Sequence, residues 1–204
     1  MEELYLEHIT TRGCLEVICG SMFSGKTEEL IRRIKRARFA NLRISTFKPA
    51  IDVRYSSNDV VSHDAHAINS RPVKEAKEIL ELAGDAQVIG IDEVQFFDDS
   101  IVDVCKQLAD AGVRVICAGL DMDYLGNPFG PMPHLMAMAE YVTKVHAICV
   151  MCGDLAQHSY RTIKNDNLVV LGETDAYKPL CRACYNKAMV RIADSNKNDN
   201  KQSL

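Results

Sequence analysis

A glycine-rich stretch that follows an apolar run constrains the fold of this chain more than any other feature. The run Cys14–Cys19 has the composition of a buried strand, and the eight residues after it fit the pattern G-x-x-x-x-G-K-[ST]. They are Gly20, Ser21, Met22, Phe23, Ser24, Gly25, Lys26 and Thr27. The glycines let backbone N–H groups converge on phosphate oxygens, the Lys26 amine reaches the β- and γ-phosphates, and the Thr27 hydroxyl binds Mg²⁺. A helical pattern opens at Lys26, so a phosphate-binding loop is favoured over a plain solvent loop.

Strands and helices alternate along the chain as far as residue 146. Apolar runs predict further strands at 42–47, 88–93, 113–118 and 141–145. Helical patterns predict helices at 72–82, 100–111 and 135–140, and two long loops span 50–70 and 119–133. This alternation predicts an α/β fold of the P-loop NTPase type, RecA-like, with a parallel sheet flanked by helices.

Two acids, Asp92 and Glu93, end the predicted strand at 88–93. A carboxylate that ends a sheet strand beside a phosphate loop holds Mg²⁺, directly or through water, which suits Asp92. Side chains alternate along a strand, so Glu93 is expected to point the other way and to reach a hydroxyl nucleophile. Capping of the following turn is the alternative interpretation of both acids.

Two C-x-x-C pairs mark the C-terminal part: Cys149 with Cys152, and Cys181 with Cys184. Four thiolates at this spacing suit a closed, tetrahedral, structural Zn²⁺ site. Buried free thiols and a redox pair are the alternatives. The chain is accordingly divided into an entry segment (1–12), a P-loop α/β domain (13–146), a zinc-binding domain (147–191) and a tail (192–204). The polar composition of that tail predicts disorder.

Charge and hydropathy narrow the class of protein further. The net charge of -4 disfavours a nucleic-acid-binding protein, which would normally have a basic face. No apolar run is long enough for a membrane span, and the acidic start Met1-Glu2-Glu3 does not resemble a signal peptide. We therefore expect a cytoplasmic protein that acts neither on nucleic acid nor at a membrane.

The phosphate loop, the run I-D-E-V-Q-F-F at 91–97 and the paired cysteines together resemble type II thymidine kinase, the small zinc-containing family of bacteria and animal cytosol. The resemblance covers about residues 13–187. The segment 52–57 resembles the family's D-x-R-Y-S-S motif, and 127–130 its P-F-G loop. The segment 170–177 resembles the lasso that closes over the base, so the zinc-binding domain corresponds to the family's lasso domain.

This resemblance implies transfer of the ATP γ-phosphoryl group to the 5′-hydroxyl of thymidine, giving dTMP and ADP. Glu93 then matches the general base, and Asp92 with Thr27 the Mg²⁺ site. ATP would be bound by the loop at 20–27 and by Asp92, Glu93, Val94 and Gln95. The positions that match the nucleoside pocket are Met22, Phe96, Tyr124, Phe129, Ser159, Val170, Leu171, Gly172, Glu173, Thr174 and Tyr177.

The resemblance also implies a homotetramer and feedback inhibition by dTTP. The chain departs from the family at Tyr124, where Phe is more common, and at Ser159, where Thr is more common. Arg161 falls near a basic position of the family. A RecA-like ATPase that acts without a nucleoside acceptor is the alternative function, and a non-enzymatic zinc-ribbon module is a third hypothesis that leaves the phosphate loop unexplained.

Overall fold

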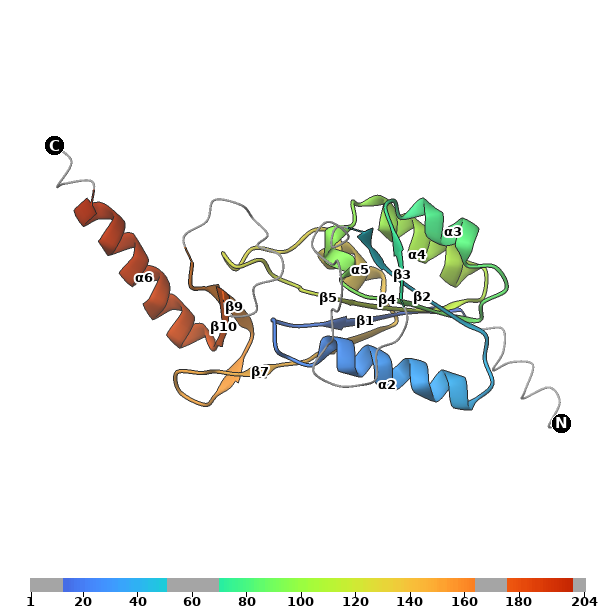
Figure 1. Cartoon of the computed structure of the whole chain (residues 1–204), viewed down its shortest axis with the longest axis horizontal. Coiled ribbons are helices and arrows are strands. Elements are labelled where there is room, and N and C mark those ends of the chain that lie inside the picture. The colour runs from blue at the N-terminus through green and yellow to red at the C-terminus, as the bar shows by residue number, and fades with distance from the viewer. Residues whose placement is uncertain (1–12, 51–69, 164–175, 200–204) are drawn as a thin grey trace.

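A six-stranded parallel sheet forms the centre of the molecule (Figure 1). The structure is a computed structural model that describes residues 13–50, 70–163 and 176–199. Beyond residue 190 it describes the backbone only. The strand order is β3-β2-β4-β5-β1-β6, and every neighbouring pair is parallel. The strands are β1 (Cys14–Cys19), β2 (Ile44–Pro49), β3 (Arg71–Val73), β4 (Val88–Ile91), β5 (Arg114–Gly119) and β6 (Tyr141–Lys144).

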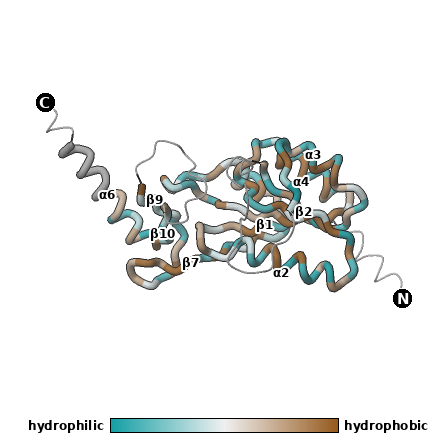
Figure 2. The backbone as a smooth tube through the Cα atoms, viewed as in Figure 1, coloured by the Kyte–Doolittle hydropathy of each residue, from teal (hydrophilic) through white to brown (hydrophobic). Residues whose placement is uncertain are grey.

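Helices cover both faces of this sheet. Helix α2 (Lys26–Phe39) lies on one face, and α3 (Lys77–Leu82) and α4 (Ser100–Asp110) lie on the other (Figure 1). Strand β1 is buried on both sides, because Val17 packs in the cluster that includes α4 and Ile18 packs with α2. Hydrophilic and hydrophobic residues alternate along helix α2, as expected of a helix with one buried face (Figure 2).

The strand order brings two loops to the same edge of the sheet. Strand β5 lies between β1 and β4, with Cys19 opposite Gly119 and Ile91 opposite Cys117. The carboxyl ends of β1 and β4 are therefore only one strand apart. In parallel α/β sheets, ligands bind outside these ends.

Proline placement explains two differences from the sequence-based prediction of helices. The helix predicted at 72–82 begins only at Lys77, and Pro72 lies in β3 at the sheet edge, where its missing N–H is tolerated. Helix α5 (Met132–Met138) starts earlier than the predicted 135–140, because prolines are accommodated in the first turn of a helix. The strand predicted at 42–47 runs instead from Ile44 to Pro49.

A small unit follows β6 and has its own core. Strands β7 (Ala147–Ile148) and β8 (Leu155–Ala156) form one antiparallel pair, and β9 (His158–Arg161) and β10 (Tyr177–Leu180) form another. Ala147, Ala156 and Leu180 are buried between them. Helix α6 (Arg182–Asp199) projects from this unit and continues through most of the segment predicted to be disordered (Figure 1).

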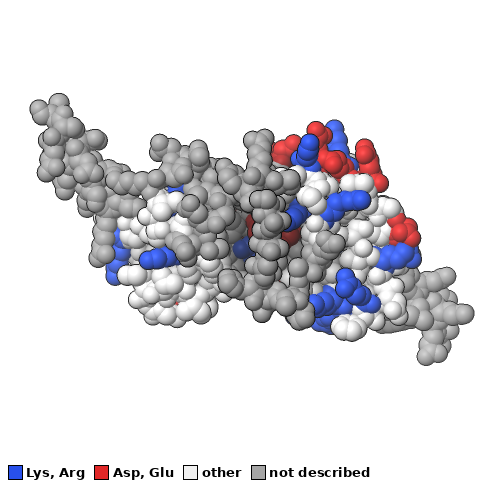
Figure 3. Space-filling view, in the orientation of Figure 1, with Lys and Arg blue, Asp and Glu red and all other residues white. Residues whose placement is uncertain are grey.

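Both signs of charge occur on the visible face. Basic side chains gather over α2, and acidic side chains gather near α3 and α4 (Figure 3). The exposed basic residues of α2 are Arg32, Lys35, Arg36 and Arg38. None of the helices in the described ranges combines the length and the apolar character that crossing a bilayer requires.

Candidate active site

The glycine-rich loop after β1 has the backbone conformation that its sequence predicts. Gly20 (φ 151°) and Gly25 (φ 83°) both have positive φ, as does Phe23 between them (φ 63°). A Cβ atom at Gly20 would lie 2.2 Å from the carbonyl oxygen of Val145, so no larger residue fits without a backbone shift. The loop therefore needs glycine at this position for space as well as for its backbone angles.

The Lys26 side chain folds back over this loop. Its Nζ donates to the carbonyl oxygen of Ser21 at 2.8 Å, and the Ser24 hydroxyl donates to the same oxygen at 2.7 Å. Burial lowers the pKa of Lys26, whereas the negative charges of Glu93 and Asp92 act in the opposite direction. Lys26 thus lies close to both acids as well as inside the loop.

Asp92 lies directly beside the start of α2. The Thr27 hydroxyl is 3.1 Å from Oδ2 of Asp92, and the Glu93 N–H donates to Oδ1 at 3.0 Å. Burial, together with the nearby Glu93 carboxylate, raises the pKa of Asp92 to about 6. A hydroxyl and a buried carboxylate in contact are oxygen ligands of the kind that Mg²⁺ takes, so these residues fit the metal that accompanies a nucleotide.

Glu93 is placed by a turn and not by strand alternation. Strand β4 ends at Ile91, and Glu93 has φ 51° and ψ 38°, the left-handed conformation, at the start of a 3₁₀ turn over Val94–Phe96. The prediction that strand alternation directs this side chain was therefore wrong. The physical reason is that the chain turns immediately after β4, and non-glycine residues held in this conformation are concentrated at functional sites.

Gln95 holds the Glu93 carboxylate from one side. Its Nε2 donates to Oε2 of Glu93 at 2.5 Å, and its Oε1 accepts the N–H of Leu120 at 3.0 Å. The backbone donor at Leu120 fixes which end of the amide is the acceptor, so the NH₂ group faces Glu93. Gln95 is 2% exposed, and Val94 beside it is fully buried.

Several aromatic residues predicted to line the nucleoside pocket contact one another or Arg161. The rings of Phe96 and Phe129 meet edge to face, with centroids 5.7 Å apart. The guanidinium carbon of Arg161 lies 3.5 Å from the centroid of the Tyr124 ring. Strand β10 pairs Tyr177 with Arg161 in β9. Five of the predicted nucleoside-site residues, 170–174, and the segment 52–57 lie outside the described residues.

Two hydrogen bonds join the phosphate loop to the C-terminal unit. The Met22 N–H donates to the Ser159 hydroxyl at 3.0 Å, and the Ser21 hydroxyl donates to the carbonyl oxygen of Ala156 at 3.4 Å. Met22 and Ser159, which are 137 positions apart in the sequence, are thus neighbours, as a shared pocket would require.

The four paired cysteines converge on one point. The sulfur atoms of Cys149, Cys152, Cys181 and Cys184 all lie within 4.8 Å of one another. Four ligands at about 2.3 Å from a tetrahedral Zn²⁺ lie roughly 3.8 Å apart, close to this spacing. Although burial opposes the effect, backbone hydrogen bonds lower the pKa of Cys149 to about 6, which favours the thiolate. The hydrogen bond with Cys181 raises the pKa of Cys184 to about 12.

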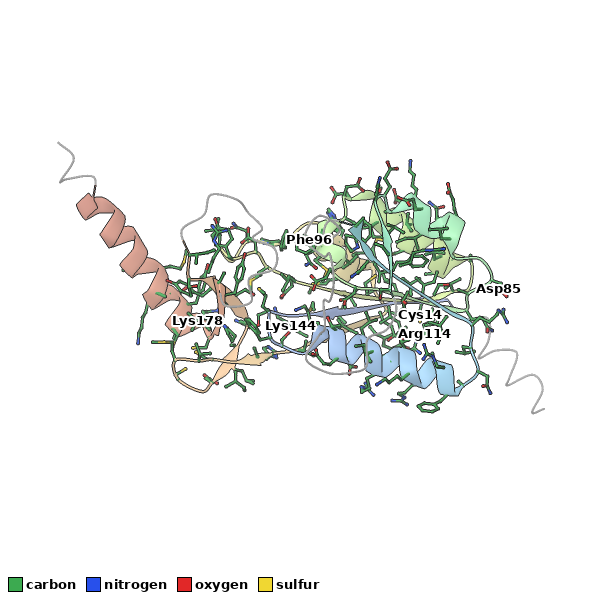
Figure 4. The ribbon with its side chains drawn as sticks, viewed as in Figure 1. Cys14, Asp85, Phe96, Arg114, Lys144 and Lys178 are labelled. Carbon is green, nitrogen blue, oxygen red and sulfur yellow. The ribbon has the colours of Figure 1, made fainter. Side chains whose placement is uncertain are left out.

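Sequence reasoning missed several polar residues at this edge. Asp121 is buried two positions beyond β5, and Lys144 pairs with it at 2.6 Å (N–O distance) from the end of β6. Lys144 lies where the sheet meets the C-terminal unit (Figure 4). The carboxyl-end position of Asp121 was the available signal. Tyr185, whose hydroxyl donates to the carbonyl oxygen of Tyr124 at 2.8 Å, carried no sequence signal.

A glycine-bent loop between a buried parallel strand and a helix, with a folded-back lysine and a Thr–Asp contact at the helix start, defines a P-loop nucleotide-binding protein. The C-terminal cysteine cluster sets it apart from a bare P-loop domain. The chain belongs to the thymidine kinase family, whose model matches residues 13–185.

Proteins named thymidine kinase in other organisms are similar to this chain over most of its length. The thymidine kinase of Bacteroides thetaiotaomicron is 63% identical over 186 residues, covering 91% of this chain and 94% of that protein. The thymidine kinase of Bacteroides fragilis is 61% identical over 187 residues, covering 92% and 94%. Among solved structures, the flagellar accessory protein FlaH of Methanocaldococcus jannaschii aligns with a TM-score of 0.48 at 16% identity, covering 83% of this chain and 88% of that chain.

Proposed function

We propose that this protein transfers the γ-phosphoryl group of ATP to the 5′-hydroxyl of thymidine, producing dTMP and ADP. Membership of the thymidine kinase family supports the reaction. One observation carries the assignment of the site: Asp92 contacts Thr27 at the start of α2, and the next residue, Glu93, is held in a left-handed turn at the same edge of the sheet. That edge also presents the phosphate loop.

The phosphate loop would bind the ATP phosphates through its backbone N–H groups. Lys26, which bonds the carbonyl oxygen of Ser21 in this structure, would turn its ammonium group to the β- and γ-phosphate oxygens. Mg²⁺ bound with ATP would be held by Thr27 and Asp92 and would neutralise charge on the phosphates. A bound cation would favour the ionised carboxylate of Asp92, against the burial that raises the pKa of this group to about 6.

Glu93 would accept the proton of the 5′-hydroxyl. As this oxygen forms its bond to the γ-phosphorus, the bond from the γ-phosphorus to the bridging oxygen of ADP breaks, and ADP leaves with that electron pair. Little covalent chemistry is required of the protein, so positioning dominates the rate. The hydrogen bond from Gln95 orients the Glu93 carboxylate for this step.

The nucleoside would lie between the phosphate loop and the C-terminal unit. Met22 and Ser159 are in contact there, and the Phe96–Phe129 pair offers an apolar wall for a pyrimidine with a methyl group. Tyr124 and Tyr177 complete this proposed pocket. Backbone groups of the segment 170–174 are proposed to read the edge of the base.

Zinc would have a structural role in this protein. Four cysteine ligands leave no open coordination position for substrate, so the metal would hold the C-terminal unit together and supply no chemistry to the reaction. Assembly into a homotetramer, inhibition by dTTP and a cytoplasmic location are parts of the same proposal, supported by the family alone.

Transfer of labelled phosphate tests this function. The protein is incubated with γ-labelled ATP, Mg²⁺ and thymidine, and the products are separated. We expect labelled dTMP to form only when thymidine is present. Consumption of ATP at the same rate without thymidine, and with no labelled dTMP, would instead support the RecA-like ATPase.

A further inference from the structure

Tyr124, a residue of the proposed nucleoside pocket, is held from two directions by the C-terminal unit. The Tyr185 hydroxyl of α6 donates to its backbone carbonyl oxygen at 2.8 Å. The Arg161 guanidinium of β9 lies over its ring, 3.5 Å from the centroid. One contact fixes the backbone and the other fixes the ring, so together they leave Tyr124 little freedom.

Tyr185 is itself anchored by the core of the C-terminal unit. It directly follows Cys184, is 6% exposed, and its ring stacks on His158 with centroids 4.4 Å apart. The ring of Tyr160 meets it edge to face. The position of this hydroxyl therefore depends on the fold of the cysteine-held unit.

Arg161 approaches Tyr124 from the paired strands β9 and β10. It is 8% exposed and lies opposite Tyr177 in the strand register. A guanidinium stacked on an aromatic face is attracted to it more strongly when both are shielded from water. Because Arg161 is the strand partner of Tyr177 and its side chain lies over the Tyr124 ring, it relates the positions of these two tyrosines to each other.

The loop that carries Tyr124 is stiff enough to transmit this restraint. Oδ1 of Asp123 accepts the N–H groups of Leu125 and Asn127 at 2.8 and 2.9 Å, which closes a tight turn. At the other end of the turn, the Phe129 N–H donates to the carbonyl oxygen of Asp121. A displacement of Tyr124 would therefore also shift the wall formed by Phe129.

We propose that Tyr185 and Arg161 are positioning residues that set the affinity for the nucleoside by holding Tyr124, without contacting the substrate themselves. The cysteine cluster would thus act on nucleoside binding through Tyr185. This inference rests on the proposed function, because it assumes that Tyr124 lines the nucleoside pocket.

The substitution Tyr185→Phe tests the backbone contact, because it removes the hydroxyl and keeps the ring that stacks on His158. We expect the KM for thymidine to rise about fivefold, the fold-change that corresponds to one lost hydrogen bond. The KM for ATP and the zinc content should stay close to those of the wild type, and the melting temperature should fall by only a few degrees. The matched control is Tyr160→Phe, since the Tyr160 hydroxyl has no hydrogen-bond partner among the described residues.

The substitution Arg161→Lys tests the ring contact, because it keeps the charge and loses the flat surface that stacks. We expect the KM for thymidine to rise by about three- to thirtyfold, again with the KM for ATP unchanged. If Tyr185→Phe does not fold, Arg161→Lys still tests the proposal. Equal losses for both substrates in a correctly folded, zinc-loaded variant would indicate a merely structural role and would overturn the inference.

Measurements on the wild-type protein distinguish a failure of this inference from a failure of the proposed function. If it makes labelled dTMP and both variants keep its KM for thymidine, the inference is wrong and the function stands. If it neither binds thymidine in a calorimeter nor makes labelled dTMP, the function is wrong and the inference falls with it.

Discussion

Replacement of Gln95 by methionine isolates the residue that orients the proposed base. Gln95→Met keeps the length of the buried side chain and removes both amide contacts, to Glu93 at 2.5 Å and to Leu120 at 3.0 Å. A hydrogen bond to a charged group contributes about 1.5–3 kcal/mol. If that contact is needed in the transition state, kcat falls by roughly 10- to 100-fold. The KM for ATP should change little, because the phosphates are proposed to bind to the loop at 20–27.

The same substitution has a predicted cost in stability. The Leu120 N–H loses its acceptor, which costs about 1–3 kcal/mol, and each kcal/mol lowers the melting temperature of a chain of this size by about 2–4 °C. Steady-state kinetics with labelled ATP, measured well below the melting temperature of the variant, separates the two effects. The matched control is Gln107→Met at an exposed position of α4, which should leave kcat within about twofold of the wild type. A Gln95→Met enzyme with the kcat of the wild type would refute the positioning argument.

Three further perturbations test other parts of the structure. Burial would raise the pKa of Glu16, but hydrogen bonds from two arginines lower it below its ordinary value of 4.5, so ionised Glu16 stabilises the fold above that pH. Glu16→Gln should therefore cost about 3 kcal/mol in urea unfolding at pH 7, and this difference should shrink as the pH falls below 4.5; an equal difference at pH 7 and pH 3 would contradict it. Gly20→Ala should weaken ATP binding by about tenfold, measured by calorimetry, whereas Gly84→Ala, with open space around its Cβ, should not. We expect metal analysis to find about one zinc per wild-type chain, and Cys152→Ser should lose it and should lower the melting temperature; full zinc content in the variant would remove Cys152 from the site.

Features that depend on residues close together in the sequence could be predicted from the sequence. The phosphate loop after β1 could be predicted because a mostly apolar run of six residues, a glycine-rich turn and a helical pattern stand next to one another. The type and spacing of the four cysteines likewise predict a metal site, and their sulfur atoms converge in space.

Features that depend on tertiary contacts could not be predicted in the same way. Pro72 is tolerated in β3 because this strand lies at the edge of the sheet, and no local sequence pattern predicts that edge position. Glu93 lies in a left-handed turn after the end of β4, so strand alternation does not apply to its side chain, and such a conformation is unusual for a residue other than glycine. The contact between Tyr185 and Tyr124 joins residues 61 positions apart, so it appears only when the C-terminal unit is folded against the sheet.

The substitution Glu93→Gln tests the central claim most directly, because it keeps the shape of the side chain and removes its ability to take a proton. ATP affinity is measured by calorimetry, and turnover by transfer of label to thymidine. We predict an unchanged Kd for ATP and a kcat lowered by about 10²- to 10⁴-fold, the usual contribution of a general base. A variant that binds ATP and phosphorylates thymidine at nearly the wild-type rate would contradict the account.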